Sequence, residues 1–192
     1  MEDITDASRT EQVLSPWVTL VTHHVRFAEM PGTHQFHSFK QADYVTMFAV
    51  TADGQIPLIR QYRPALERYT LELPSGLLEA GESPAQAAAR ELLEETGLVP
   101  GASIEPLGSM AADSGRLENR IWSFFTADVS FKKNAGWRPD PRLECRLVSR
   151  AGLKELVLTG QFDHALHLAV IGQAMLRGLF SFNQAESKKQ FI

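Results

Sequence analysis

The pattern of apolar and polar positions along the chain predicts a domain with more strands than helices. Runs rich in Val, Ile, Thr and aromatic residues, bounded by turn-forming residues, are typical of strands. Such strands are expected over residues 17–27, 34–39, 44–51, 56–62, 69–73, 104–110, 120–129 and 143–149. Helices are expected over residues 84–96, 151–158 and 164–180. This order favours the α/β (α+β) class, a mixed sheet flanked by helices. The polar stretch 1–15 is expected to be frayed or extended, and 132–142 to be a loop.

The helix over 84–96 has both of its ends marked in the sequence. Ser83 is suited to the N-cap, Pro84 to the first helical position, and Gln86 completes a capping box. Strong helix formers fill the segment, and Gly97 stands where a glycine commonly ends a helix.

Composition and charge narrow the classes of function. The chain has 192 residues, which fits one domain, and a net charge of −4. This charge argues against a nucleic-acid partner, and a polyanionic substrate would need a metal ion or a few placed arginines. The sequence shows no signal peptide and no apolar run of membrane-spanning length. Cys145 is the single cysteine, so an intramolecular disulfide is excluded, and the cytoplasm is the expected location.

Three glutamates of the predicted helix form the strongest candidate site. Glu91 and Glu95 are one turn apart, and Glu94 lies beside them. By themselves they fit a solvated helix face, with Arg90 paired to Glu94 four residues on. They also fit a site for a hard cation, because Mg²⁺ and Mn²⁺ prefer carboxylate oxygens.

The surrounding residues favour the cation site. Gly76, then Glu82, then Arg90-Glu91-Leu92-Leu93-Glu94-Glu95-Thr96-Gly97-Leu98 stand at the spacing of the Nudix box, Gly-x5-Glu-x7-Arg-Glu-U-x-Glu-Glu-x-Gly-U, where U is aliphatic. Every specified position of this 23-residue motif matches, so the chain resembles the Nudix hydrolases. The flanking Arg60-Gln61-Tyr62-Arg63-Pro64 and Glu72-Leu73-Pro74-Ser75-Gly76 resemble the branch that hydrolyses ADP-ribose and related nucleotide sugars.

This resemblance implies an α/β/α sandwich with a central mixed sheet, and it assigns roles to the box residues. It implies that Mg²⁺ or Mn²⁺ is held by Glu91, Glu95 and the carbonyl of Ser75, with Glu82 supporting the cluster. Arg90 would orient a glutamate through charge-assisted hydrogen bonds, and Gly76 would let the backbone approach the metal. Glu94 would be a further metal or water ligand, or the general base.

For residues outside the box, the sequence leaves more than one role open. Glu144 and Glu118 are alternative second bases, each weighed evenly against a surface carboxylate. Arg63 matches the phosphate-binding arginine of the ADP-ribose branch. Trp17 and Phe36 could stack on a base or sugar, although core or dimer contacts are the more common role of such aromatics.

The implied reaction is hydrolysis of the diphosphate bond in a nucleoside diphosphate linked to another group. ADP-ribose or a related nucleotide sugar is the expected substrate, giving a nucleoside monophosphate and a sugar phosphate. One departure weakens strict ADP-ribose specificity, because residues 112–115 lack the proline that the subgroup carries there. The alternatives are a housecleaning hydrolase of nucleoside triphosphates and a non-catalytic nucleotide-sugar sensor.

Three segments are expected in the chain: an N-terminal β extension over 1–40, a Nudix domain over 41–183 and a loose tail over 184–192. The extension is not part of the minimal Nudix fold, and by resemblance to enzymes with such extensions we expect a homodimer. Neither a nucleic-acid nor a membrane partner is expected. His164 and His167 share a helix face, but with no carboxylate visible nearby we interpret them as structural residues rather than zinc ligands.

Overall fold

The computed structural model describes residues 4–132 and 137–183. The chain divides into two compact units, which are described separately. The first unit comprises Met1–Asp43 and Met110–Ile121, and the second comprises Tyr44–Ser109 and Trp122–Ile192. The expected tail over 184–192 lies outside the described residues.

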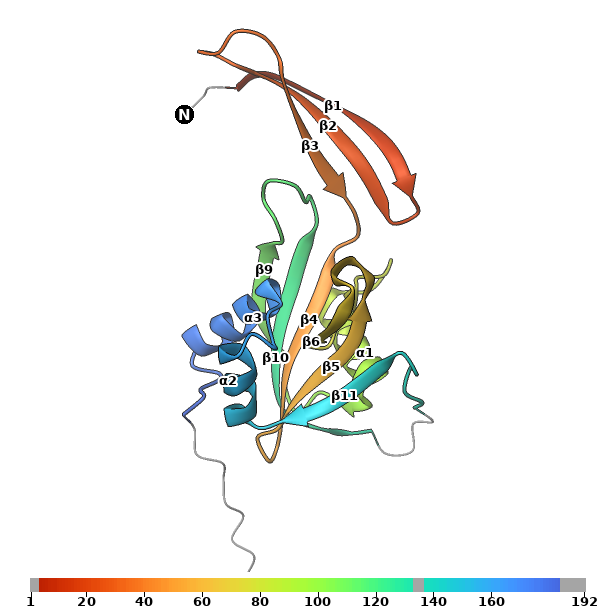
Figure 1. The fold of residues 1–192 in the computed structure, drawn as a ribbon, viewed down its shortest axis with the longest axis vertical. Helices are drawn as coiled ribbons and strands as arrows, with labels where there is room; N and C mark the ends of the chain where they lie inside the picture. The colour runs from red at the N-terminus through yellow and green to blue at the C-terminus, as the bar shows by residue number, and fades with distance from the viewer. Residues whose placement is uncertain (1–3, 133–136, 184–192) are drawn as a thin grey trace, which may run out of the picture. The chain divides into compact units, whose positions relative to one another are not determined.

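The first unit contains an antiparallel sheet of three strands in the order β1-β2-β3 (Figure 1). These strands are Ile4–Ser15, Val18–Phe27 and His34–Lys40. Within the polar segment 1–15, the described residues 4–15 are extended rather than frayed: β1 pairs along its length with β2, from Ile4 opposite Phe27 to Ser15 opposite Val18. Its many polar side chains are compatible with a strand because β1 is largely exposed.

The second unit is built around a five-stranded mixed sheet in which β7, β4, β10 and β8 are neighbours and β9 pairs with β10. The bounds are Ser75–Leu77 for β7, Tyr44–Thr51 for β4, Arg120–Phe131 for β10, Leu98–Val99 for β8 and Glu105–Ala111 for β9. A second sheet has the order β11-β5-β6, formed by Leu143–Val148, Ile56–Arg63 and Arg68–Glu72. A single 3₁₀ turn, Pro64–Leu66, joins β5 to β6.

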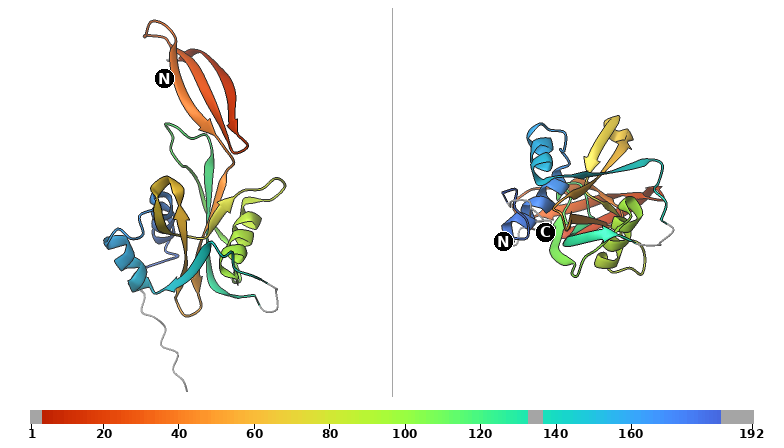
Figure 2. Two further views of the ribbon diagram at one scale, coloured as in Figure 1. Left: turned by 45° about the vertical axis from the view of Figure 1, so that its right-hand side comes forward. Right: turned by 90° about the horizontal axis from the view of Figure 1, so that it is seen from below.

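Among the described residues, three α-helices flank the sheets: α1 (Pro84–Thr96), α2 (Arg150–Leu158) and α3 (Ala165–Leu176). Helix α1 lies on one side of the central sheet and α2 and α3 on the other, so the sandwich expected from the sequence is confirmed (Figures 1 and 2). Helix α3 is shorter than the predicted 164–180, because His164 acts as its N-cap and Gly178 adopts a left-handed φ of 71° just beyond its end. In the described part of the chain, no helix has the length and hydropathy needed to cross a membrane.

Strand β4 organises the core because helices cover both of its faces. Every residue from Val45 to Val50 is buried, as expected for a central strand covered on both sides. Val45, Met47 and Ala49 belong to one core cluster with Ala87, Ala88 and Leu92 of α1. Phe48 points to the other face, where its ring lies edge-on to Phe125 and Phe180. This packing holds α1 firmly against the sheet and so places its polar face.

Candidate active site

Helix α1 begins and ends where the sequence predicted. Ser83 accepts a hydrogen bond from the Gln86 amide, and the Gln86 side chain accepts one from the Ser83 amide, so the capping box is confirmed. Gly97 ends the helix with a φ of 74°. Ala87, Ala88 and Leu92 are buried against the sheet. Glu91, Glu94 and Glu95 therefore lie on faces turned away from the core.

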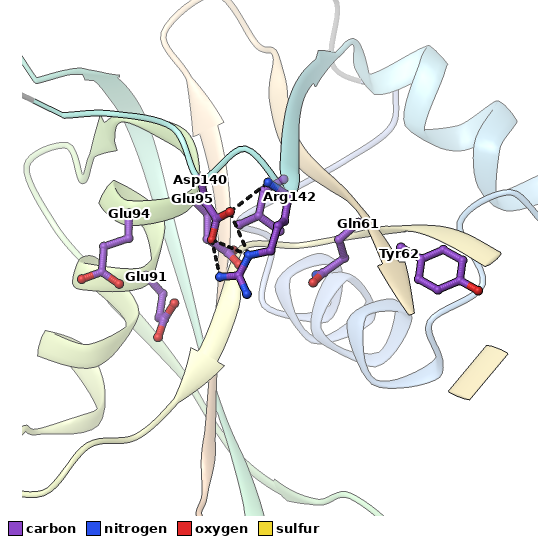
Figure 3. Close-up of a pocket in the computed structure, with 8 residues that line it drawn as sticks. Gln61, Tyr62, Glu91, Glu94, Glu95, Asp140 and Arg142 are labelled. Atoms are coloured by element: carbon purple, nitrogen blue, oxygen red, sulfur yellow. Dashed lines mark hydrogen bonds and ion pairs between the residues drawn. The ribbon is translucent and has the colours of Figure 1, made fainter. Parts of the chain in front are cut away.

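All three glutamates line one cleft of about 530 Å³ in the second unit (Figure 3). The other lining residues come from β5 and from the segment before and at the start of β11. They are Gln61, Tyr62, Asp140, Arg142 and Leu143. The cleft thus combines a carboxylate-rich wall with a cationic side chain, which is the combination that a metal-bound anionic substrate requires.

Arg90 organises the carboxylates with one guanidinium group. Its Nε and one terminal nitrogen donate to Glu82 at 2.8 and 3.0 Å, and it also donates to the Leu77 carbonyl at 3.1 Å. Its other terminal nitrogen donates to Glu91 at 2.7 Å and to Glu94 at 3.2 Å. The hydrogen bonds from Arg90 lower the pKa of Glu82 despite some desolvation. Arg90 thereby fixes the orientation of Glu91 and ties α1 to the preceding loop.

Burial makes two carboxylates of the cleft, Glu91 and Glu95, costly to ionise. Desolvation raises the pKa of Glu91 even though Arg90 donates to it. Desolvation also raises the pKa of Glu95, to about 8, and the charges of Glu91 and Glu72 add to this, while the Ser75 amide opposes it. Two carboxylates that are this costly to ionise together favour a bound cation, because its charge would offset both penalties.

The backbone next to these carboxylates lacks a side chain at the point where Glu91 lies against it. A Cβ atom added at Gly76 would lie 2.1 Å from Oε1 of Glu91 and 2.5 Å from its Oε2. Only glycine therefore allows the Glu91 carboxylate to lie against the chain here. The Ser75 amide donates to Oε2 of Glu95 at 3.0 Å. Carboxylates from one helix, placed against a glycine-bearing strand, fit a Mg²⁺ or Mn²⁺ ion by their hard oxygen donors.

A histidine that we interpreted from the sequence as structural lies against this strand. His167 of α3 accepts a hydrogen bond from the Leu73 amide at 3.0 Å through Nδ1, and its Nε2 lies 3.4 Å from the Ser75 hydroxyl. Burial lowers the pKa of His167 to about 3, and the neighbouring His164 contributes to the shift. The ring is therefore neutral at physiological pH.

Arg63, the expected phosphate-binding residue, is held by a buried glutamate. Its Nε and a terminal nitrogen donate to the two oxygens of Glu72 at 2.8 and 2.6 Å, and Thr70 donates to the same carboxylate at 2.7 Å. Burial alone would raise the pKa of Glu72, but the hydrogen bonds from Arg63 and Thr70 hold it at about 2. Arg63 is not among the residues that line the cleft, although its side chain is 44% exposed.

We expect this ion pair to make stability depend on acid pH. The carboxyl has a pKa of about 2 in the folded protein against 4.5 for an unperturbed glutamate, so its contribution is full above pH 4.5 and is lost as pH falls toward 2. At about 1.4 kcal/mol per pKa unit, that contribution is at most about 3 kcal/mol. Urea titrations should show wild type more stable than Glu72→Gln at pH 6, with the difference shrinking as pH falls. A difference that does not change with pH would contradict this role.

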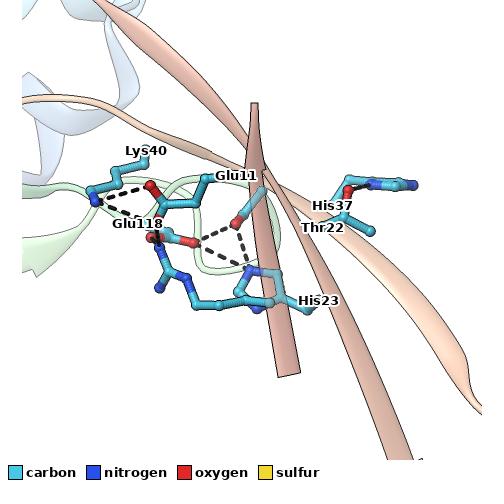
Figure 4. Close-up of polar contacts among 8 residues, drawn as sticks. Glu11, Thr22, His23, His37, Lys40 and Glu118 are labelled. Atoms are coloured by element: carbon cyan, nitrogen blue, oxygen red, sulfur yellow. Dashed lines mark hydrogen bonds and ion pairs between the residues drawn. The ribbon is translucent and has the colours of Figure 1, made fainter. Parts of the chain in front are cut away.

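Glu144 and Glu118, the two alternative second bases, are each paired with other polar side chains. Glu144 follows Leu143 in β11, so the two side chains point to opposite faces of the strand, and only Leu143 lines the cleft. The Glu144 carboxylate is paired with Arg146 at 2.7 Å and with Arg60 at 3.4 Å. Glu118 belongs to the first unit, where it accepts from Ser38 at 2.6 Å and lies 3.2 Å from His23 (Figure 4).

The aromatics considered for stacking also belong to the first unit. Trp17 is 70% exposed in the β1–β2 turn, and Phe36 is half exposed on β3. Phe36 borders a second hollow of that unit, together with His23 and Glu118.

Asp140 and Arg142 are cleft residues that the sequence did not single out. Asp140 accepts from the Arg142 side chain at 2.6 Å and from its amide at 2.8 Å, and these bonds lower the pKa of Asp140 to about 2. Their one signal in the sequence is the Pro139-Asp140-Pro141 turn, which lies just before Glu144. Trp137 attaches this segment to α1, because its indole nitrogen donates to the Glu94 carbonyl at 3.0 Å.

Comparison with known proteins shows the family of this chain. The sequence model of the NUDIX domain matches residues 40–165. A methanol dehydrogenase activator from Bacillus methanolicus is 35% identical over 66% of this chain and 68% of its own. An ADP-ribose pyrophosphatase from Bacillus subtilis is 48% identical over 45% of this chain, which spans about half of that relative (47%). A mouse ADP-sugar pyrophosphatase is 39% identical over 44% of this chain and 38% of its own.

A solved structure shares the fold over nearly the whole chain. It is described as an ADP compounds hydrolase and superposes with a TM-score of 0.74, covering 92% of this chain and 96% of its own. The sequence identity is 20%, so this likeness concerns the fold alone.

Proposed function

Because this chain belongs to the Nudix hydrolase family, we propose that it cleaves the diphosphate bond of a nucleoside diphosphate linked to another group. The observation that carries this proposal is the cleft in which Glu91, Glu94 and Glu95 face Arg142. ADP-ribose or a related nucleotide sugar is the proposed substrate, supported by the names of the relatives from Bacillus subtilis and mouse.

The proposed cofactor is Mg²⁺ or Mn²⁺, which Glu91, Glu95 and the Ser75 carbonyl would hold. When bound, such an ion neutralises phosphate charge and lowers the pKa of coordinated water. Glu82 and Arg90 keep the ligands oriented, as outer partners of metal sites commonly do.

The reaction then needs a proton acceptor and a diphosphate contact from the cleft. Glu94 is exposed in the cleft and accepts the proton of the attacking water, which adds in line to one phosphorus. Arg142 is largely exposed and supplies positive charge to the diphosphate. The products are a nucleoside monophosphate and a sugar phosphate.

A product assay on several substrates tests the function. Purified enzyme with Mg²⁺ is given ADP-ribose, ADP-glucose, GDP-mannose, UDP-glucose and a nucleoside triphosphate. AMP and ribose 5-phosphate from ADP-ribose are the expected products. Release of pyrophosphate from the triphosphate alone would favour the housecleaning alternative, and no cleavage of any of them would favour the sensor.

The base assignment predicts different results for glutamates inside and outside the cleft. Glu94→Gln should lower kcat by about 10²- to 10⁴-fold, the usual contribution of a general base. Glu144→Gln should retain the wild-type pH–rate profile, because that side chain is bound to Arg146 and Arg60 outside the cleft. Glu118→Gln serves as a second control. A loss in either control with Glu94→Gln near wild type would move the base to that residue.

A homodimer formed through the β1–β3 sheet is part of the proposal. This sheet exposes a group of apolar side chains unusual for a solvated surface: Ile4, Val13, Leu14, Trp17, Phe36 and Phe39. Its edge strand β1 is long and could pair further. Light scattering at micromolar concentration should give the dimer mass, and a monomer mass would refute this assembly.

A further inference from the structure

The segment that leads from the end of β6 into the first residues of β7 sets the position of a proposed metal ligand. We call residues 73–76 the strap. The Ser75 amide of the strap donates to the Glu95 carboxylate at 3.0 Å, and the Pro74 carbonyl accepts from the Met47 amide of β4 at 2.9 Å. A shift of the strap would therefore move both Ser75 and the hydrogen bond that orients Glu95.

His167 contacts the strap at two points. Its Nδ1 accepts from the Leu73 amide, so the proton of the neutral ring is on Nε2, which faces the Ser75 hydroxyl. The Ser75 hydroxyl in turn donates to the Leu73 carbonyl at 2.9 Å. These contacts close a small hydrogen-bonded ring around the strap. Its anchor, 98% buried, comes from a helix more than 90 residues further along the chain.

We propose that His167 is a positioning residue for the metal site, acting through the strap on Ser75 and Glu95. The inference rests on the proposed function for the identity of the metal ligands. Outer partners that orient metal ligands are worth about 10- to 100-fold in metal affinity or activity, even though they touch neither metal nor substrate. His167 has the position of such a partner.

A different use of His167 is less consistent with its contacts. Ligand atoms of Glu72, His164 and His167 lie within 4.8 Å of one another and could in principle hold a metal themselves. Both Glu72 oxygens already accept from Arg63, and both His167 nitrogens face polar atoms of the strap. A cation there would have to displace these contacts and lie beside a guanidinium. The geometry therefore favours positioning over direct ligation.

The test uses Mn²⁺ as the probe and measures binding as well as turnover. His167→Leu removes both strap contacts, and we expect Mn²⁺ affinity, followed by electron paramagnetic resonance, to fall about 10- to 100-fold. The kcat should fall with it, while the substrate KM at saturating metal stays near wild type. The Ser75 amide should exchange faster with solvent in the metal-free variant, as measured by nuclear magnetic resonance.

Two conservative variants keep the test informative if the leucine variant does not fold. His167→Asn offers an oxygen near the Nδ1 position for the Leu73 amide, and His167→Gln reaches toward the Ser75 hydroxyl. Each should recover part of the Mn²⁺ affinity. His164→Asn is the control for the neighbouring ring: asparagine can replace His164 as the cap of α3, and the substitution removes the ring stacked on His167 while leaving both contacts of His167 with the strap. It should bind Mn²⁺ like wild type.

The outcomes separate this inference from the proposed function. Folded His167 variants with wild-type Mn²⁺ affinity and wild-type Ser75 exchange would overturn the positioning role. Loss of a Zn²⁺- or Mn²⁺-binding event in both the His164 and His167 variants would overturn it in favour of direct ligation. If wild type cleaves none of the substrates but binds Mn²⁺ with the predicted sensitivity to His167, the proposed function fails and the positioning role stands.

Discussion

Glu95→Gln and Glu91→Gln are expected to lose more than about 10²-fold in kcat while keeping the fold. Loss of an outer partner of a metal ligand already costs about 10- to 100-fold, so loss of a ligand itself should cost more. Glutamine preserves the size of the side chain and its contact with the Ser75 amide or Arg90, but lacks the charge that a divalent cation requires. Turnover of ADP-ribose with Mg²⁺, together with circular dichroism, measures both properties.

Without metal, Glu95→Gln should also be more stable than wild type at neutral pH. Burial raises the pKa of Glu95 to about 8 from 4.5, so the folded metal-free protein binds a proton more tightly than the unfolded chain. Its stability therefore falls as pH rises from 4.5 toward 8. Metal-free Glu95→Gln escapes this penalty and should be more stable than wild type at pH 7, by about 1–3 kcal/mol.

Thermal unfolding with and without the ion supplies the control. Mg²⁺ should raise the Tm of wild type, since a ligand that binds the folded state stabilises it, but not that of Glu95→Gln. Near-normal turnover in both glutamine variants, or an equal Mg²⁺ effect on wild type and Glu95→Gln, would refute the metal assignment.

Gly76→Ala is expected to abolish most activity with little loss of stability. The new Cβ would lie 2.1 Å from a Glu91 oxygen, so one of the two groups must move. The backbone of Gly76 is not in the left-handed region, and the atoms it would meet are the flexible end of a side chain. The Glu91 carboxylate is therefore displaced rather than the strand, and a proposed metal ligand is lost.

Two comparisons isolate this steric effect. Gly172→Ala in α3 introduces the same methyl group where nothing lies within 4 Å, and should leave kcat unchanged and stability equal or higher by up to about 1 kcal/mol. In a Glu91→Gln background, Gly76→Ala should cost little more, because both changes remove the same carboxylate. A Gly76→Ala enzyme with wild-type kcat, or full additivity of the two losses, would contradict the role of Gly76.

Local sequence determined helix α1 and indicated the family. Ser83, Gln86 and Gly97 act within one helical turn of their partners, so the ends of α1 were predictable from the residues alone. The i,i+4 spacing of Glu91 and Glu95 likewise placed them together before any tertiary contact was known. The order of the other strands and helices followed from their apolar patterns, but three strands were not predicted. Strand β1 is polar and was expected only as a frayed or extended segment, and the short β7 and β8 were missed because two or three residues carry too little pattern.

Tertiary structure alone decided which distant residues join that helix. Asp140 and Arg142 line the cleft, whereas Glu144 does not. Successive side chains of a strand point to opposite faces, so Leu143 and Glu144 of β11 are separated. The register of β11 on β5 places Leu143 opposite Gln61, which also lines the cleft. The contact of His167 with Leu73 joins residues 94 apart, and the Arg63–Glu72 pair depends on the pairing of β5 with β6. Such contacts arise from how packed elements meet, and the physical rules that act within one helical turn carry no information about them.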